Sequence, residues 1–172
     1  MTDSLPTAQL AVTLTALPNS RLVTALSALV AEFCRGLVAD PAVVSRFHMA
    51  AQELAENLVK YSVGREVRLD ASLTGTPENA ELRLRATNRS TARQLDQVER
   101  CLAALVNAQD PAQHYDSLVR ASAPKDEGSG LGLARLRAEG ELTVDYSIDG
   151  DQLTISVHAS VEPRKGVPYA DS

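Results

Sequence analysis

Aromatic side chains are scarce in this 172-residue chain, which has two Phe, four Tyr and no Trp. Surfaces that stack nucleic-acid bases need several exposed rings. The formal net charge is −5, whereas non-specific binding to phosphate backbones needs clustered Lys and Arg. The composition therefore argues against a nucleic-acid partner. It also requires a hydrophobic core built mainly from Ala, Leu and Val.

Cysteines and long apolar runs are also few. The two cysteines, Cys34 and Cys101, lie far apart within apolar helical patterns and form no C-x-x-C pair. Unreactive packed thiols explain them better than a redox or metal site. The N-terminus has no basic segment followed by an apolar one, and no apolar run reaches membrane-spanning length. We therefore expect a cytoplasmic protein without membrane contacts.

The spacing of apolar residues predicts ten secondary-structure elements. Asn19 or Ser20 is a suitable cap for one helix, and Asp40-Pro41 is a suitable start for the next. Strands are expected over 9–17, 66–74, 80–86, 142–148 and 153–161. Helices are expected over about 20–37, 41–61, 92–108 and 111–121, with a last one ending near 139.

The order of these elements, β-α-α-β-β-α-α-α-β-β, lacks the regular alternation of a Rossmann fold. Strands joined by hairpins, with the helices kept apart, indicate an α+β fold. We expect a two-layer α/β sandwich in which a mixed, mostly antiparallel sheet lies under a helical layer. Residues 1–161 should form a single domain. Residues 162–172, rich in Pro, Gly and charge, should form a flexible C-terminal tail.

The helix predicted over 41–61 carries three polar residues on one face. Glu53 and Asn57 are four residues apart, and Lys60 follows three residues later. Glu53 is suited to act as a base, Asn57 to supply an oxygen ligand to Mg²⁺, and Lys60 to contact a phosphate. Taken alone, the three residues fit an ordinary solvated helix face better than a site.

A glycine-rich motif forms the second candidate site, just before the last predicted helix. Glycines at alternate positions allow close approach of the backbone to a ligand, and the free N–H groups of a helix start attract anions. Lys125 lies just upstream. The spacing matches neither a dinucleotide-binding motif nor a Walker P-loop. The motif consists of Gly128, Ser129, Gly130, Leu131, Gly132 and Leu133.

Together and in this order, the two segments resemble the GHKL, or Bergerat, ATPase superfamily. The stretch A-A-Q-E-L-A-E-N-L-V-K-Y-S over 50–62 resembles its N box, and G-S-G-L-G-L over 128–133 resembles its G2 box. The resemblance covers roughly residues 9–161. It implies a histidine-kinase-like ATP-binding domain that uses ATP and Mg²⁺, with Asn57 as the magnesium ligand and Glu53 as the catalytic carboxylate. The glycine-rich motif, Lys60 and Lys125 would then contact the nucleotide.

One segment departs from the superfamily pattern. Where the family has D-x-G-x-G, whose Asp accepts the adenine amino group, this chain has Asn88-Arg89-Ser90. An Asn at this position, followed by D-x-x-x-x-Y over 110–115 and the glycine-rich motif, is similar to the SiaB-type branch of bacterial kinases. Those proteins resemble anti-sigma-factor serine kinases. Asn88 is accordingly a candidate contact for adenine, with neutral donors and acceptors in place of a charge.

The resemblance implies a regulatory kinase that phosphorylates Ser or Thr of a small partner protein resembling an anti-sigma-factor antagonist. Relatives of this type often pair, so a homodimer is also expected. The altered segment around Asn88 leaves a second interpretation open, in which the chain is an inactive pseudo-ATPase that regulates its partner by docking. A third interpretation is the ATPase module of a split histidine kinase, which requires a separate phosphoacceptor protein.

Overall fold

The computed structural model describes residues 8–15, 19–64, 66–76, 79–122, 131–139 and 142–165. These ranges contain all ten expected elements, in the expected order. The α+β sandwich is therefore confirmed. The strands are β1 (Ala8–Thr15), β2 (Glu66–Thr76), β3 (Asn79–Arg89), β4 (Thr143–Asp149) and β5 (Gln152–Val161). The helices are α1 (Ser20–Leu37), α2 (Pro41–Tyr61), α3 (Ala92–Asn107), α4 (Pro111–Ser122) and α5 (Leu131–Glu139).

Local capping chemistry explains where the longer helices begin. The Asn19 side chain accepts hydrogen bonds from the backbone N–H groups at the start of α1, and Asp40 accepts one at the start of α2. Thr91 and Gln94 form a reciprocal capping box at the start of α3. Each cap binds N–H groups that have no partner within the helix.

The strands form one sheet in the order β1-β2-β3-β5-β4. Every described pair in it is antiparallel, so the expectation of a mixed sheet is corrected. The strands β3 and β4 run in the same direction, but β5 returns from β4 through the Gly150 turn and lies between them. Strands that run in the same direction are therefore never neighbours in this sheet.

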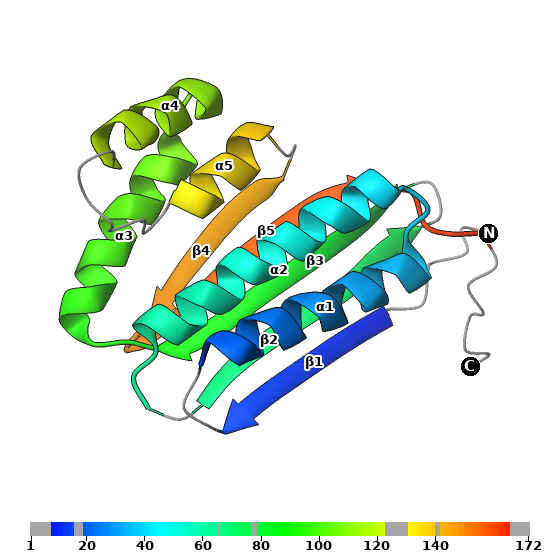
Figure 1. The fold of residues 1–172 in the computed structure, drawn as a ribbon, viewed down its shortest axis with the longest axis horizontal. Coiled ribbons are helices and arrows are strands. Elements are labelled where there is room, and N and C mark those ends of the chain that lie inside the picture. Colours follow the sequence, from blue (N-terminus) through cyan, green and yellow to red (C-terminus); the bar gives the residue numbers. More distant parts are fainter. Residues whose placement is uncertain are drawn as a thin grey trace.

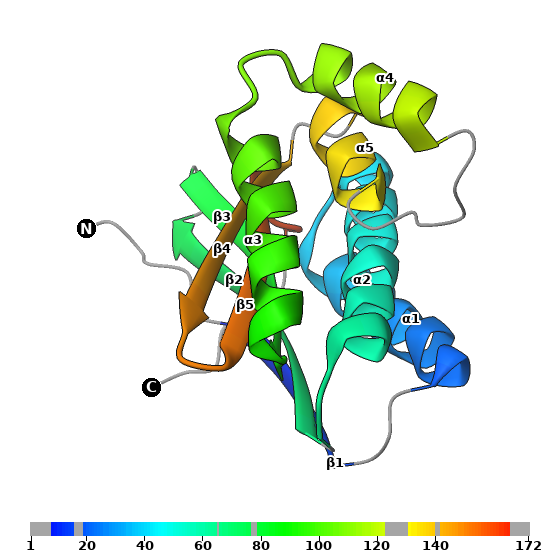
Figure 2. The same ribbon diagram turned by 90° about the vertical axis from the view of Figure 1, so that its left-hand side faces the viewer.

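The described helices lie on one side of the sheet, with α4 packed on α5 (Figures 1 and 2). Inward-facing residues of β2, β3 and β5 alternate with polar residues, as expected of an antiparallel sheet with one buried face. The helix α2 lies over β3, with α1 packed along its side. Its residues Phe47, Ala50, Ala51 and Leu54 are completely buried. The core is therefore centred on α2.

The chain leaves the sheet beside the connection between α1 and α2. Val38 pairs with Pro163, and the backbone N–H of Arg164 donates to the carbonyl of Leu37 at 2.7 Å. Residues 162–164, where the tail was expected to begin, thus make backbone contacts with the domain. Residues 166–172 lie outside the described part of the chain. Among the described residues, no helix combines the length and the apolar character needed to cross a bilayer.

Truncation of the core of α2 should destabilise the fold strongly. Leu54 is fully buried, so Leu54→Ala should lower the free energy of unfolding by about 2–5 kcal/mol through lost burial and the remaining cavity. Urea unfolding monitored by circular dichroism measures the change. Leu29→Ala, at an exposed position of α1, is the control and should change stability by less than about 0.5 kcal/mol. Equal losses in both variants would contradict this location of the core.

Candidate functional site

The face of α2 that carries Glu53 and Asn57 meets the start of α5 in the structure. Glu53 and Asn57 are half-buried on α2, whereas Lys60 is exposed with its Nζ 5.3 Å from the centroid of the Tyr61 ring. The helix α5 begins at Leu131, so Gly132 and Leu133 of the motif lie in its first turn, whereas the sequence predicted that the whole motif precedes the helix. Lys125, Gly128, Ser129 and Gly130 lie outside the described residues.

The two motifs approach each other at Glu53 and Gly132. A Cβ atom built on Gly132 would overlap the Glu53 carboxylate. A glycine is therefore required at this position for the carboxylate to lie where it does. The sequence resemblance predicts that these segments share one site, and the structure brings this pair of residues into contact.

Glu53 lies in a hollow of about 270 Å³ between α2 and α5, which also includes Arg46 and Arg135. Burial raises the pKa of the Glu53 carboxyl above its ordinary value, and the neighbouring Glu56 carboxylate adds to the rise, while Arg135 opposes it. Arg135 itself donates to Glu139 at 2.9 Å. Glu53 is thus a carboxyl group held partly away from water, beside an arginine whose Nε is engaged elsewhere. This environment favours a proton acceptor of increased basicity.

Asn57 lines a separate, much smaller cavity on the other side of the α5 start. This cavity measures about 20 Å³, which is enough for roughly one water molecule. The Tyr61 hydroxyl is buried and has no hydrogen-bond partner among the described residues. The lining combines amide, phenol and thiol groups with apolar walls, and consists of Asn57, Tyr61, Val98, Cys101, Leu102, Leu133 and Ile155.

The chemistry of this cavity suits a nucleotide base, because apolar walls with a few polar groups are typical of such sites. Its volume does not. With α2, α3 and α5 in the described positions, a base cannot enter between Asn57, Leu102 and Leu133. Nucleotide binding here would require α3 or α5 to move away from α2. Among the described residues, no cluster of three or more His, Cys, Asp or Glu side chains is arranged to hold a metal ion.

Asn88 joins the end of β3 to the end of α2. Its buried Nδ2 group donates to the Tyr61 carbonyl at 3.3 Å and to Ser90 Oγ at 2.9 Å. Ser90 Oγ in turn donates to the same Tyr61 carbonyl at 2.8 Å. The amide donors of Asn88 therefore serve a structural link, and Asn88 does not line the cavity of Asn57. The sequence pattern alone did not indicate this link, because its acceptor is a backbone carbonyl 27 residues away.

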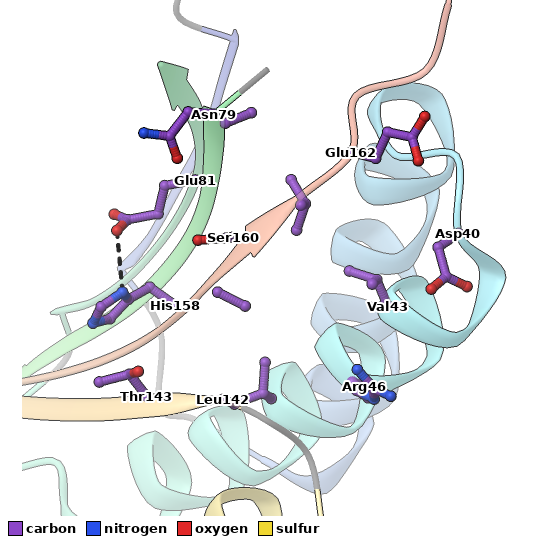
Figure 3. A pocket seen from close by; sticks show the side chains of 13 residues that line it. Asp40, Val43, Arg46, Asn79, Glu81, Leu142, Thr143, His158, Ser160 and Glu162 are labelled. Carbon is purple, nitrogen blue, oxygen red and sulfur yellow. Dashed lines mark ion pairs between the residues drawn. The ribbon is translucent and has the colours of Figure 1, made fainter. Parts of the chain in front are cut away.

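A hollow of about 800 Å³ contains none of the predicted site residues. It lies where the start of α2 meets the ends of β3 and β5 (Figure 3). Here His158 Nδ1 is 3.2 Å from Glu81 Oε2, and Nε2 is 2.8 Å from Asp145 Oδ2. One imidazole thus links two carboxylates across three strands. Only the strand register brings these residues together, so no local sequence signal could reveal the cluster.

Comparison with known proteins was informative only at the level of structure. No protein-family model matches the chain, and no curated protein sequence matches it. A chain in the crystal structure of the SiaB-SiaC complex from Pseudomonas aeruginosa is similar, with a TM-score of 0.56 and 15% sequence identity. The match covers 88% of this chain and 89% of that one. The chain has a SiaB-like fold. At this identity, the likeness extends to the fold alone.

The raised pKa of Glu53 predicts a pH-dependent effect of Glu53→Gln. The ionised carboxylate is disfavoured in the folded state, so it lowers stability above the raised folded pKa. As the pH falls through the window between the folded and the lower unfolded pKa, this penalty disappears. Glu53→Gln should therefore be more stable than wild type at pH 7, and the difference should shrink towards pH 4.

Urea unfolding at several pH values measures this effect. The control is Glu99→Gln, which removes an exposed carboxylate from α3 and should show no comparable trend. If Glu53→Gln is no more stable than wild type at pH 7, or if its advantage grows on acidification, the environment described for Glu53 is contradicted.

Proposed function

We propose that this chain is a regulatory ATP-binding protein of bacterial signalling that phosphorylates a small partner protein on Ser or Thr. The observation that carries the proposal is the contact between Glu53 and Gly132. It joins the two segments whose combined resemblance implies a Bergerat ATPase.

In this proposal each predicted residue has a defined task. Asn57 would supply an oxygen ligand to Mg²⁺, and Lys60, Lys125 and the glycine-rich motif over 128–133 would contact phosphates. Bound ATP would supply the phosphoryl group, with Mg²⁺ neutralising its charge. Glu53 would orient the partner's hydroxyl group and accept its proton. Its raised pKa supports this task, because a base is most effective when its pKa is closer to the working pH. Phosphoryl transfer depends mainly on such positioning and charge neutralisation.

The cavity beside Asn57 implies that the site opens when nucleotide binds. A volume of about 20 Å³ is far too small for a base. The helix α5 is short and begins within the glycine-rich motif, and α4 packs on it. Displacement of α5 would open both the cavity of Asn57 and the hollow of Glu53, since adjacent residues Gly132 and Leu133 line one each. The free energy needed for opening would weaken the apparent affinity for ATP.

A second function, regulation by docking without catalysis, is favoured by a specific observation. The amide donors of Asn88 are directed to Tyr61 and Ser90, at the position where the superfamily has its adenine-binding Asp. If the cavity of Asn57 stays closed, the domain would act as a scaffold that binds its partner. Both functions assume a small protein partner. The structurally similar chain comes from a complex of two proteins, SiaB and SiaC, which supports this assumption. A cytoplasmic location and a homodimer remain part of the proposal.

Calorimetric titration with ATP, with and without Mg²⁺, separates the two functions. The kinase proposal predicts magnesium-dependent binding that Asn57→Ala abolishes. Asn107→Ala, which removes an exposed asparagine at the end of α3, is the matched control and should bind like wild type. Absence of ATP binding under every condition would contradict the kinase proposal and would favour the docking function.

Transfer of γ-labelled phosphate tests catalysis itself. Wild-type protein added to an extract of the source cells should label a small protein on Ser or Thr, as identified by phosphoamino-acid analysis. Glu53→Ala should lower the rate of labelling by about 100-fold or more, the usual effect of removing a positioned base. Labelling at the full rate by this variant would remove the role assigned to Glu53.

A further inference from the structure

The face of the sheet opposite the helices is polar, and no described helix covers it (Figure 2). Its charged side chains are mostly paired with one another. Arg68 donates to both carboxylate oxygens of Asp70, at 2.7 and 2.8 Å. Arg83 donates to Glu81 at 2.8 Å, on the same face of β3. These pairs leave few charges on the middle of the face without a partner.

Arg85 is the exception. It is exposed on β3, directly opposite Asp70 of β2 and Ser156 of β5. The carboxylate of Asp70, its natural cross-strand partner, is already occupied by Arg68. Arg85 makes no hydrogen bond or ion pair with any described residue. The Arg85 guanidinium group, with its positive charge and five N–H donors, therefore has no acceptor among the described residues on this face of the sheet.

Arg85 lies in a hollow of about 410 Å³ on this face. Three arginines but only one carboxylate line it, in a protein whose net charge is −5. Hydroxyl groups surround them, including Thr87 and Thr154, whose Oγ1 atoms are 3.1 Å apart. The lining consists of Gln9, Arg68, Asp70, Ser72, Thr74, Arg83, Arg85, Thr87, Gln152 and Thr154.

We propose that this hollow binds a small phosphomonoester through Arg85, flanked by Arg68 and Arg83. A phosphate group carries a charge between −1.5 and −2 at neutral pH and three acceptor oxygens. Arg68 is held by Asp70 and Arg83 by Glu81, so among the described residues of this hollow the guanidinium donors left without an acceptor are those of Arg85, beside the hydroxyl groups of the lining. The planar guanidinium group of arginine can donate two parallel hydrogen bonds to a phosphate, and such charge-assisted hydrogen bonds are stronger than neutral ones. This site lies on the face opposite the Glu53 hollow and does not depend on the proposed kinase function.

Binding of two probes to the full chain tests the proposal: inorganic phosphate and glucose 6-phosphate. Glucose and potassium chloride of matched ionic strength control for the sugar and for screening. Titrations followed by NMR of arginine Nε–Hε groups and backbone amides should show saturable shifts centred on β2 and β3. Arg85→Gln should weaken binding by about tenfold to a hundredfold, the value of one charge-assisted contact. Arg85→Lys, which keeps the charge and loses the fork, should be intermediate.

Arg89→Gln is the matched control, because Arg89 is exposed at the end of the same strand, outside the hollow, and 3.4 Å from Asp151. It should bind like wild type. Absence of saturable shifts, equal binding by Arg85→Gln, or shifts that follow ionic strength alone would each overturn the proposal. Binding of a phosphoserine peptide without binding of either small probe would overturn the assignment to a small molecule.

Discussion

The position of α2 is the constraint on which the rest of the structure depends. This helix packs against α1 on one side, against β3 below and against α5 above. Small residues at Ala50, Ala51 and Ala55 are buried and allow the neighbouring elements to come close, while Phe47, Leu54 and Leu58 fill the core. Because the other faces of α2 pack against α1 and β3, the face that carries Glu53 and Asn57 is directed towards α5. The candidate site is therefore a consequence of core packing.

Contact with α5 divides this face into two environments. Gly132 admits the Glu53 carboxylate to a hollow open to solvent, whereas Leu133, one residue later, closes the cavity beside Asn57. The short helix α5 therefore contacts both the hollow of Glu53 and the cavity of Asn57. Movement of α5 would change the surroundings of both residues at once. The open face of the sheet has a different chemistry, because its donors cluster around Arg85 instead of a carboxylate.

Local chemistry explains why so much of the fold was predictable from the sequence. The caps at Asn19 and Asp40 and the apolar stripe of α2 are short-range signals, and the structure confirms the elements they predict. The antiparallel order of β3, β5 and β4 was not predictable, because it depends on how a hairpin inserts between two strands. The resemblance that spans both segments predicted one shared nucleotide site, but it did not predict the contact between Glu53 and Gly132. The hydrogen bonds of Asn88 and the hollow of Arg85 depend on strand register and on long-range backbone acceptors, which leave no local signal.

The most direct test of this account is a double-mutant cycle between Glu53→Ala and Gly132→Ala, measured by urea unfolding. In wild type, a methyl group at position 132 must displace the carboxylate, so the gain in helix propensity should be offset. In the Glu53→Ala background the space is free, and Gly132→Ala should stabilise the protein by several tenths of a kcal/mol. The account predicts a coupling free energy of at least about 0.5 kcal/mol. Additive effects of the two substitutions would show that the two motifs are not in contact, and would contradict the site proposed here.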